Sequence, residues 1–467
     1  MRKRLNKLLW NFGLLAFLGS VPGIVAQTSP ASHVSKMERD FQAAMAAEDR
    51  GDLEQAETLL STLHKEHPGI FAVDESLGLI YAGREDFLRA LPLLQSAVRE
   101  QPSSDVAHAN LGATFYRLHR DAPAREEFEY AVRINPRNFS AQESLGRLSM
   151  DAHRPDEAAG ALLAAQRLKP DDADLKLDCV TALLAANRVD EARMMLSSFP
   201  DSDRSARAQS LLGEADEKQG KFQEAGKRLA RAVELEPSEE NAWQLGYDFL
   251  RHWAFDAAIT EFQTASAKFP GSKRLKLGLG IALFGDAKYS ETIPVFADLL
   301  ASEPDNAMYA ELLGIACNGP LETTSPRCAA LVNYAQAHPA DANAATYAAS
   351  SLMKHSDSEP NVDLARKLLE RALAANPNLP EAQFEMGVVL QDSSDWKGSI
   401  PYLERALKLK PDYAQAHYRL ARAYWRTGRK AEGQAQMELQ KKFARQEQED
   451  LRRRLDRITS LAVTVQP

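Results

Sequence analysis

The sequence predicts an all-α protein in which one pair of helices is repeated along most of the chain. Three observations predict this class: prolines return at a nearly constant interval, apolar residues recur at spacings of three and four, and a small residue occupies one slot per interval. The composition agrees, because Ala and Leu are abundant and Val/Ile runs are few. With 44% hydrophobic residues among 467, the chain can bury a large core.

The prolines set the period. Eleven prolines follow one another at intervals of 34, 34, 34, 30, 37, 33, 34, 35, 38 and 34 residues. A proline ends a helix because it lacks an N–H and restricts the residue before it. An Asp, Ser or Asn then follows, as in PDDADLKL and PDNAMYAE, and is suited to cap the next helix. The prolines are Pro68, Pro102, Pro136, Pro170, Pro200, Pro237, Pro270, Pro304, Pro339, Pro377 and Pro411.

One small residue per period indicates where the two helices of a pair come close. Because Gly inside a helix costs about 1 kcal/mol relative to Ala, its recurrence predicts a contact that leaves no room for a Cβ. An Ala recurs twelve residues later, for example Ala90 and Ala124. The small-residue slot holds Gly78, Gly112, Gly146, Gly213, Gly246, Gly280, Gly314, Gly387, Ala349 and Ala421.

This pattern resembles the tetratricopeptide repeat family. Gly112, Ala124, Phe128, Ala131 and Pro136 match every slot of its motif. The resemblance spans residues 37–433 and implies a right-handed α-solenoid of about twelve antiparallel helix pairs. It also implies a concave groove lined by the first helix of each pair.

Two repeats depart from the pattern. The repeat that ends at Pro200 has Cys179 in the place of the usual Leu, and its second helix is short. In the repeat that ends at Pro377, Ala349 and Ala365 are 16 residues apart instead of twelve. We expect a loop four residues longer between its helices, and a change of pitch at both places.

The N-terminus has the layout of a secretory signal peptide. Residues 1–7 carry four positive charges, residues 8–18 are apolar apart from Asn11, and a small residue, Ala26, marks a cleavage site. We expect residues 1–26 to be removed, with 27–36 as a linker, so that the protein is periplasmic or secreted without a stable transmembrane span. An uncleaved membrane anchor is the alternative.

The C-terminal segment, residues 434–467, is predicted to be a highly charged helix followed by a loose tail. We expect the helix to cap the last repeat, because a terminal repeat needs a polar cover. A coiled-coil dimer is the alternative, and the sequence leaves the oligomeric state open.

The charge and the repeats exclude several function classes. Loss of residues 1–26 removes four basic groups and no acidic ones from totals of 57 and 65, which leaves a net charge of −12. We therefore expect no nucleic-acid partner. The repeats leave no room for a catalytic domain, so neither an enzyme nor a cofactor is expected. His64 and His67 have no third ligand nearby in sequence, so no metal site is expected.

The best candidate binding site is a strip of apolar residues on three consecutive first helices. We predict that an apolar face of a protein or extended peptide binds there, with Trp243 and Tyr247 as anchors, because Trp and Tyr are enriched among the residues that dominate binding energy at interfaces. The alternatives are that these residues pack against each other as core, or that the assigned repeat register is off by one residue. The strip comprises Trp243, Tyr247, Leu250, Leu277, Ile281, Phe284 and Ile315, with Met308 and Glu311 among them.

A second candidate is a cluster on the first helix of the last pair. It comprises Tyr418, Arg422, Trp425 and Arg426. The preceding first helix presents acidic residues on the corresponding side, so a structural network is expected. The alternative is a site for an anion or a peptide carboxylate, which suits the guanidinium fork. The expected neighbours are Glu381, Phe384, Glu385 and Asp392.

Two of the three cysteines are predicted to pair. Cys317 lies near the end of a first helix and Cys328 begins the second, so antiparallel packing brings them together. Oxidising conditions outside the cytoplasm favour the bond. Cys179 replaces a buried Leu and should stay a free thiol; three inert buried thiols are the alternative.

These observations predict an exported, non-catalytic scaffold that binds a protein or an extended peptide through its concave groove. The alternative is a structural subunit of an envelope assembly or polysaccharide-export complex, which the resemblance to exported family members suggests.

Overall fold

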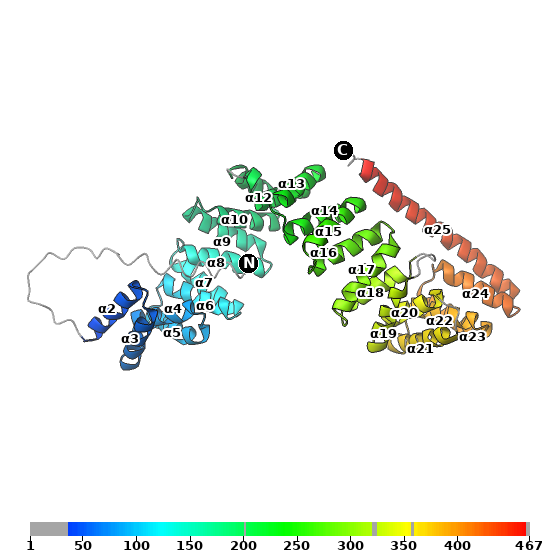
Figure 1. Cartoon of the computed structure of the whole chain (residues 1–467), viewed down its shortest axis with the longest axis horizontal. Coiled ribbons are helices and arrows are strands. Elements are labelled where there is room, and N and C mark those ends of the chain that lie inside the picture. Colours follow the sequence, from blue (N-terminus) through cyan, green and yellow to red (C-terminus); the bar gives the residue numbers. More distant parts are fainter. Residues whose placement is uncertain (1–35, 200–201, 320–324, 356–358, 464–467) are drawn as a thin grey trace, which may run out of the picture. The chain divides into compact units, whose positions relative to one another are not determined.

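The computed structural model describes residues 36–199, 202–319, 325–355 and 359–463. The predicted signal peptide, residues 1–26, lies outside them. Within the described ranges the chain forms 24 α-helices, α2 to α25, two short 3-10 helices and no strand (Figure 1). Each even-numbered helix packs on the odd-numbered helix that follows it, which gives twelve pairs. The predicted α-solenoid of helix pairs is therefore confirmed.

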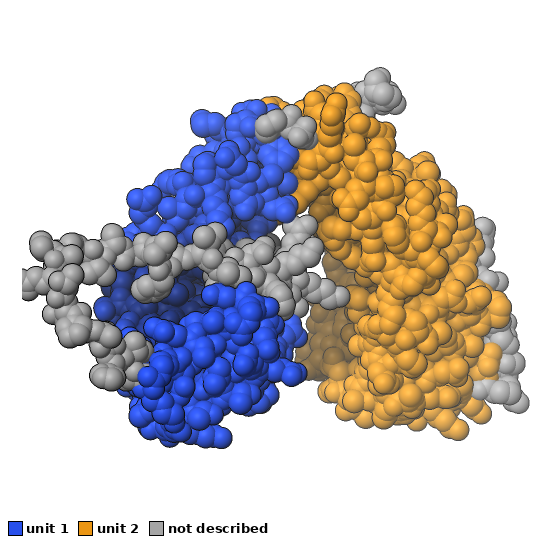
Figure 2. Space-filling view, turned by 60° about the vertical axis from the view of Figure 1, so that its left-hand side comes forward, with its two compact units in different colours: residues 1–202 blue, residues 203–467 orange. Residues whose placement is uncertain are grey.

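The chain divides into two compact units, Met1–Ser202 and Asp203–Pro467 (Figure 2). The first unit contains α2 (Lys36–Asp49), α3 (Leu53–Glu66), α4 (Phe71–Gly83), α5 (Phe87–Glu100), α6 (Asp105–Arg117), α7 (Asp121–Ile134), α8 (Phe139–Asp151), α9 (Pro155–Leu168), α10 (Ala173–Ala185) and α11 (Val189–Ser197). The division follows α11, which has only nine residues. It thus falls at the repeat whose sequence departs from the motif.

The second unit holds the remaining seven pairs. The 3-10 helix η1 (Ser202–Arg204) lies at the division. The helices are α12 (Ala206–Lys218), α13 (Phe222–Leu235), α14 (Glu239–Arg251), α15 (Phe255–Lys268), α16 (Lys273–Gly285), α17 (Tyr289–Ser302), α18 (Ala307–Cys317), η2 (Pro326–Cys328), α19 (Ala329–Ala337), α20 (Ala342–His355), α21 (Glu359–Ala375), α22 (Pro380–Asp392), α23 (Trp396–Leu409), α24 (Ala414–Arg426) and α25 (Lys430–Val463).

The residues after most of the prolines cap the first helices, as predicted, whereas α4, α22 and α24 have no side-chain cap. Ser104 lies two residues after Pro102, and its hydroxyl accepts a hydrogen bond from the backbone N–H of Ala107. Asn138 and Asp172 do the same for α8 and α10. Each cap satisfies an N–H that the helix itself leaves without a partner. The regular spacing of the prolines therefore sets a regular spacing of the residues at which the first helices begin.

The small-residue slot is where the two helices of a pair touch. A Cβ on Gly280 would lie 2.3 Å from a ring carbon of Phe296 in α17, and one on Gly246 would lie 2.5 Å from the ring of Phe262 in α15. Gly314 is an exception, because its nearest neighbour is Tyr347 of the next first helix. The Ala twelve residues after the slot is fully buried in α5, α7, α9, α13 and α15. The inferred close approach is therefore confirmed.

The expectation of a longer loop before α21 is wrong. Helices α20 and α21 have 14 and 17 residues, whereas most other pairs have 13 and 14. The four extra residues therefore lengthen the helices, because a turn of helix satisfies its own backbone groups and a longer loop does not.

The C-terminal segment does not begin as a separate helix at residue 434. Helix α25 runs without a break for 34 residues from Lys430, so its first turns are the second helix of the last pair. Among the described residues, no helix is both long and apolar enough to cross a membrane.

Candidate functional site

The predicted apolar strip lies on α14, α16 and α18 of the second unit. Tyr247, Ile281 and Ile315 are 34 residues apart, so they hold the same position on three consecutive first helices. Their exposed fractions are 49%, 38% and 36%, and that of Met308 on α18 is 47%. These four side chains form the exposed part of the strip.

The other members of the strip are half-buried. Trp243 and Leu250 pack against a cluster that includes Ala258 and Phe262 of α15. Leu277 and Phe284 pack against the neighbouring cluster around Phe296 of α17. The core alternative therefore holds for these four side chains, which support the exposed ones from below.

Contacts around Trp243 hold the start of the strip in place. Its ring stacks on Tyr247 with centroids 5.9 Å apart and meets Phe262 at 5.7 Å. The Arg274 guanidinium lies 4.4 Å from the indole centroid, which is a cation–π distance, and donates to a carboxylate oxygen of Glu240 at 2.7 Å. Tyr247 is therefore an exposed ring on a fixed aromatic support.

A shallow pocket of the second unit lies away from the strip, on second helices. It is formed by α19 and α21, and Arg371 in its wall donates a hydrogen bond to the carbonyl of Ala335 at 2.9 Å. The pocket is lined by Gln336, Leu364, Lys367, Leu368, Glu370, Arg371 and Ala374. Sequence reasoning assigned it no role.

The arginine cluster on α24 has different partners from those expected. Arg422 and Arg426 lie over the ring of Trp396, the first residue of α23, at 5.4 and 5.3 Å from its centroid. Tyr418 and Trp425 are exposed, at 43% and 39%. The predicted network of these arginines with acidic residues of α22 is therefore replaced by stacking.

Those acidic residues are engaged by other groups. Asp392 lies 3.5 Å from Arg419, and Glu381 lies 3.6 Å from Lys410. Glu385 accepts a hydrogen bond from the hydroxyl of Ser350 at 2.9 Å, and burial raises the pKa of its carboxyl. Phe384 is buried in the core of the last pairs. The local register was predicted, but the choice of salt-bridge partners was not.

The start of α25 covers the end of the array. His417 of α24 is buried, and its Nε2 lies 2.9 Å from the carbonyl oxygen of Pro411. Its Nδ1 lies 2.5 Å from a side-chain oxygen of Gln436, and its ring stacks on Phe443 with centroids 5.4 Å apart. The aromatic and histidine content of α24 therefore serves packing in large part.

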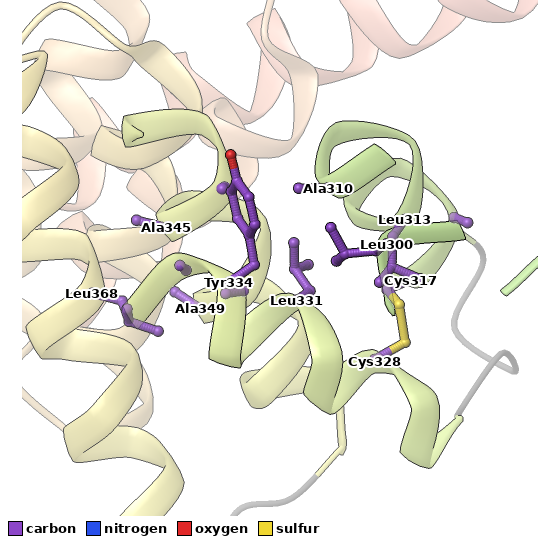
Figure 3. Close-up of a cluster of buried hydrophobic side chains, with 14 of the residues drawn as sticks. Leu300, Ala310, Leu313, Cys317, Cys328, Leu331, Tyr334, Ala345, Ala349 and Leu368 are labelled. Atoms are coloured by element: carbon purple, nitrogen blue, oxygen red, sulfur yellow. A yellow bond between two sulfur atoms is a disulfide. The ribbon is translucent and has the colours of Figure 1, made fainter. Parts of the chain in front are cut away.

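Cys317 and Cys328 form a disulfide, with Cα atoms 6.0 Å apart (Figure 3). Both residues are buried in one cluster with Leu313 of α18 and Leu331 of α19. The bond therefore joins the last residue of α18 to the last residue of η2, directly before α19, within the core of this pair. Cys179 is buried and free, and burial raises the pKa of its thiol to about 12.

Sequence reasoning missed a cluster of two carboxylates and a histidine at the ends of α12 and α14. His252 Nε2 lies 2.5 Å from Glu217 Oε1 and 3.8 Å from Asp248 Oδ1. Burial, followed by the negative charge of Glu217, raises the pKa of Asp248 to about 6.

A signal for this cluster exists in the sequence. Glu217 and His252 are 35 residues apart, one period plus one. The same separation joins Tyr116 to Asp151 and Ser350 to Glu385 by hydrogen bonds. Residues at this offset face each other on consecutive first helices, so a search at 35 residues finds the pair that a local motif search overlooks.

The fold and the strip together define a helix-pair repeat scaffold with an apolar face on its first helices. Tetratricopeptide repeat sequence models match residues 41–105, 75–139, 110–173 and 384–434, and a second model of the same repeat matches residues 149–215. The chain belongs to the tetratricopeptide repeat family. No curated protein sequence matches it significantly.

Solved structures with similar folds share little sequence with the chain. A tetratricopeptide repeat protein from Parabacteroides merdae is 17% identical, with 53% of this chain and 98% of that chain covered and a TM-score of 0.38. The peptide-binding repeat protein YrrB is 18% identical over 39% and 94%, with a TM-score of 0.37. The Cut9–Hcn1 structure is 14% identical over 88% of both chains, with a TM-score of 0.35. The family assignment rests on the sequence models.

Proposed function

We propose that the chain is a non-catalytic scaffold that binds an extended segment of another protein along the exposed strip of the second unit. One observation carries the proposal: Tyr247, Ile281 and Ile315 expose apolar side chains at one repeated position of three consecutive first helices. Scattered exposed apolar residues need no explanation, but an aligned set typically marks an interaction site.

The repeat geometry suggests the form of the partner. Helices α14 and α16 are in contact, so their axes are about 8–10 Å apart. A chain in the polyproline II conformation advances about 3.1 Å per residue and returns to the same face every third residue. A partner with an apolar side chain at roughly every third residue would therefore meet successive first helices. Tyr247, with its rigid ring on a fixed support, is the expected anchor.

The non-catalytic part of the proposal is supported by the extent of the repeats. Helix pairs take up the described residues from Lys36 onward, and α-solenoids of this kind offer binding surface along their length.

We also propose that the protein works outside the cytoplasm, in the periplasm or the medium. The support is the signal-like sequence of residues 1–26 and the pairing of Cys317 with Cys328, a bond that oxidising compartments favour. N-terminal sequencing of the protein isolated from its source tests this. A chain that begins at residue 27 supports export with cleavage; a cytoplasmic chain that keeps Met1 refutes it.

The binding proposal is tested with peptides selected by display against the full chain. Affinity is then measured for the wild type and for the double variant Tyr247→Ala, Ile281→Ala. Loss of two contacts worth about 1 kcal/mol each weakens binding about 30-fold. Because both side chains are exposed, the melting temperature should change little.

The matched control is the double variant Leu88→Ala, Met194→Ala, which removes two side chains that are each 73% exposed on second helices of the first unit. It should bind as the wild type does. Equal affinity in the strip variant, an equal loss in the control, or failure to select any peptide would contradict the proposal.

A further inference from the structure

Three metal-binding side chains meet where the ends of two first helices come together. Glu217 lies in the last turn of α12, and Asp248 and His252 lie one turn apart at the end of α14. One ligand atom from each residue lies within 4.8 Å of the other two. The donors are one imidazole nitrogen and two carboxylates.

Two carboxylate oxygens of this cluster are buried without a hydrogen bond within the described part of the chain, although the imidazole of His252 lies against the other oxygen of Glu217. Asp248 is 5% exposed, and its Oδ1, 3.8 Å from His252 Nε2, accepts no hydrogen bond from any described residue. Glu217 is 9% exposed, and its Oε2 is also without a hydrogen bond. The guanidinium of Arg251 is 2.8 Å from that oxygen, but outside hydrogen-bond geometry. The Arg251 guanidinium offsets part of the charge of Glu217, whereas burial of the Asp248 Oδ1 atom is costly unless a cation or a proton joins it.

The backbone around the cluster also favours a positive charge. Glu217 is in the last turn of α12, and His252 is the C-cap residue of α14. The carbonyl end of a helix carries a partial negative charge that stabilises cations nearby. Two helix ends therefore add to the negative potential of the two carboxylates.

We propose that Glu217, Asp248 and His252 bind one divalent transition-metal ion, for which zinc is the best match. Imidazole and carboxylate ligands suit zinc, whereas calcium and magnesium prefer oxygen ligands alone. Zinc bonds of about 2.0–2.2 Å place tetrahedral donors about 3.4 Å apart. His252 Nε2 is 3.8 Å from Asp248 Oδ1, close to that value, whereas its hydrogen bond of 2.5 Å to Glu217 must open by about 0.9 Å when the ion binds.

The histidine side of the cluster is open to solvent. The side chain of His252 is 21% exposed, which leaves a path for the ion and for a water ligand. The ring of Phe222 lies against the imidazole, with centroids 4.5 Å apart, and limits its rotation. A bound ion would link α12 to α14, and with them two consecutive repeats.

The test uses the full, untagged chain after removal of metals with EDTA. Zinc chloride is titrated by calorimetry, and cobalt chloride is added separately to follow its visible absorption. We expect one zinc per chain, a higher melting temperature with zinc, and the intense absorption of a low-symmetry cobalt site. His252→Gln and Asp248→Asn should each weaken zinc binding at least tenfold.

The matched control is His108→Gln. His108 is a histidine that likewise pairs with a carboxylate, with Nδ1 2.6 Å from Glu127 Oε2, but it is buried and does not belong to a three-donor cluster of the described residues. This variant should bind zinc as tightly as the wild type.

Asp248→Asn keeps the test decisive if the histidine variant folds poorly. It preserves the side-chain size and removes one of two neighbouring buried charges, so the metal-free variant should melt no lower than the wild type. A wild type that binds no zinc, or that binds it no more tightly than Asp248→Asn, would overturn the proposal and leave a proton shared between the two carboxylates as the explanation.

Discussion

Replacement of Gly146 by Ala tests the packing inside one helix pair. Gly146 is buried in α8, where a Cβ would lie 2.6 Å from Leu162 Cγ and 3.2 Å from the Leu162 backbone nitrogen in α9. Leu162 is 1% exposed, so its side chain has no free space to enter. The new methyl group must therefore push the two helices apart.

The expected loss follows from two opposing effects. Overpacking of a core costs about 1–3 kcal/mol. Replacement of Gly by Ala inside a helix returns about 1 kcal/mol. Because the new Cβ meets a backbone atom as well as a side chain, the cost lies in the upper part of that range, about 2–3 kcal/mol, and the net loss is about 1–2 kcal/mol. Such a loss lowers the melting temperature of a unit of this size by roughly 2–8 °C.

Gly160 is the matched control, because it lies in α9 of the same pair and a Cβ there would meet no atom within 4 Å. Gly160→Ala should raise the melting temperature by about 2–4 °C, since only the helix propensity changes. Both variants are measured in the full chain by calorimetry. Shifts of the same sign, or no shift for Gly146→Ala, would refute the close-approach explanation of the slot.

Three further predictions concern the cysteines and one turn. The double variant Cys317→Ser, Cys328→Ser should lose about 3 kcal/mol of stability in the second unit by the loop-entropy estimate, seen as a lower urea midpoint; an unchanged midpoint would contradict a bond in the native protein. Because burial raises the pKa of the Cys179 thiol from 9.0 to about 12, native protein at pH 8 should react with iodoacetamide about 1000-fold more slowly than in urea, and equal rates would refute burial. Ala287 has φ of 58°, in the left-handed region, so Ala287→Gly should raise stability by about 1 kcal/mol; a lower melting temperature would contradict this.

The helix pairs could be predicted because their signals are local and repeated. A cap two residues after Pro102, a Gly at residue 112 and an Ala at residue 124 each report one feature of one pair, and the period aligns them along the chain. The four extra residues between Ala349 and Ala365 gave no such signal. An insertion of four residues lengthens the sequence equally whether it extends a helix or a loop.

Side-chain environments within the strip were harder to predict. Trp243 and Tyr247 are one turn apart on α14, yet the first is half-buried and the second is 49% exposed. Trp243 packs against Phe262 of α15 and lies under Arg274 of the next first helix. Periodicity assigns a residue to a face, whereas exposure depends on which side chain the following repeat presents there.

Contacts between repeats were the least predictable. The cluster of Glu217 and His252 joins residues 35 positions apart, and Arg422 selects an aromatic ring over nearby carboxylates. Such choices depend on the distance and angle between consecutive pairs, which no local pattern in the sequence encodes.

The central claim is that the exposed strip is the binding surface, and photo-crosslinking tests it most directly. The photoreactive residue p-benzoylphenylalanine is placed at Tyr247 in one sample and at Leu88 in another, and each full chain is irradiated with a display-selected peptide. The account predicts a crosslinked peptide from position 247 and none from position 88. Crosslinking from position 88 alone, or from neither position while the peptide is bound, would contradict it.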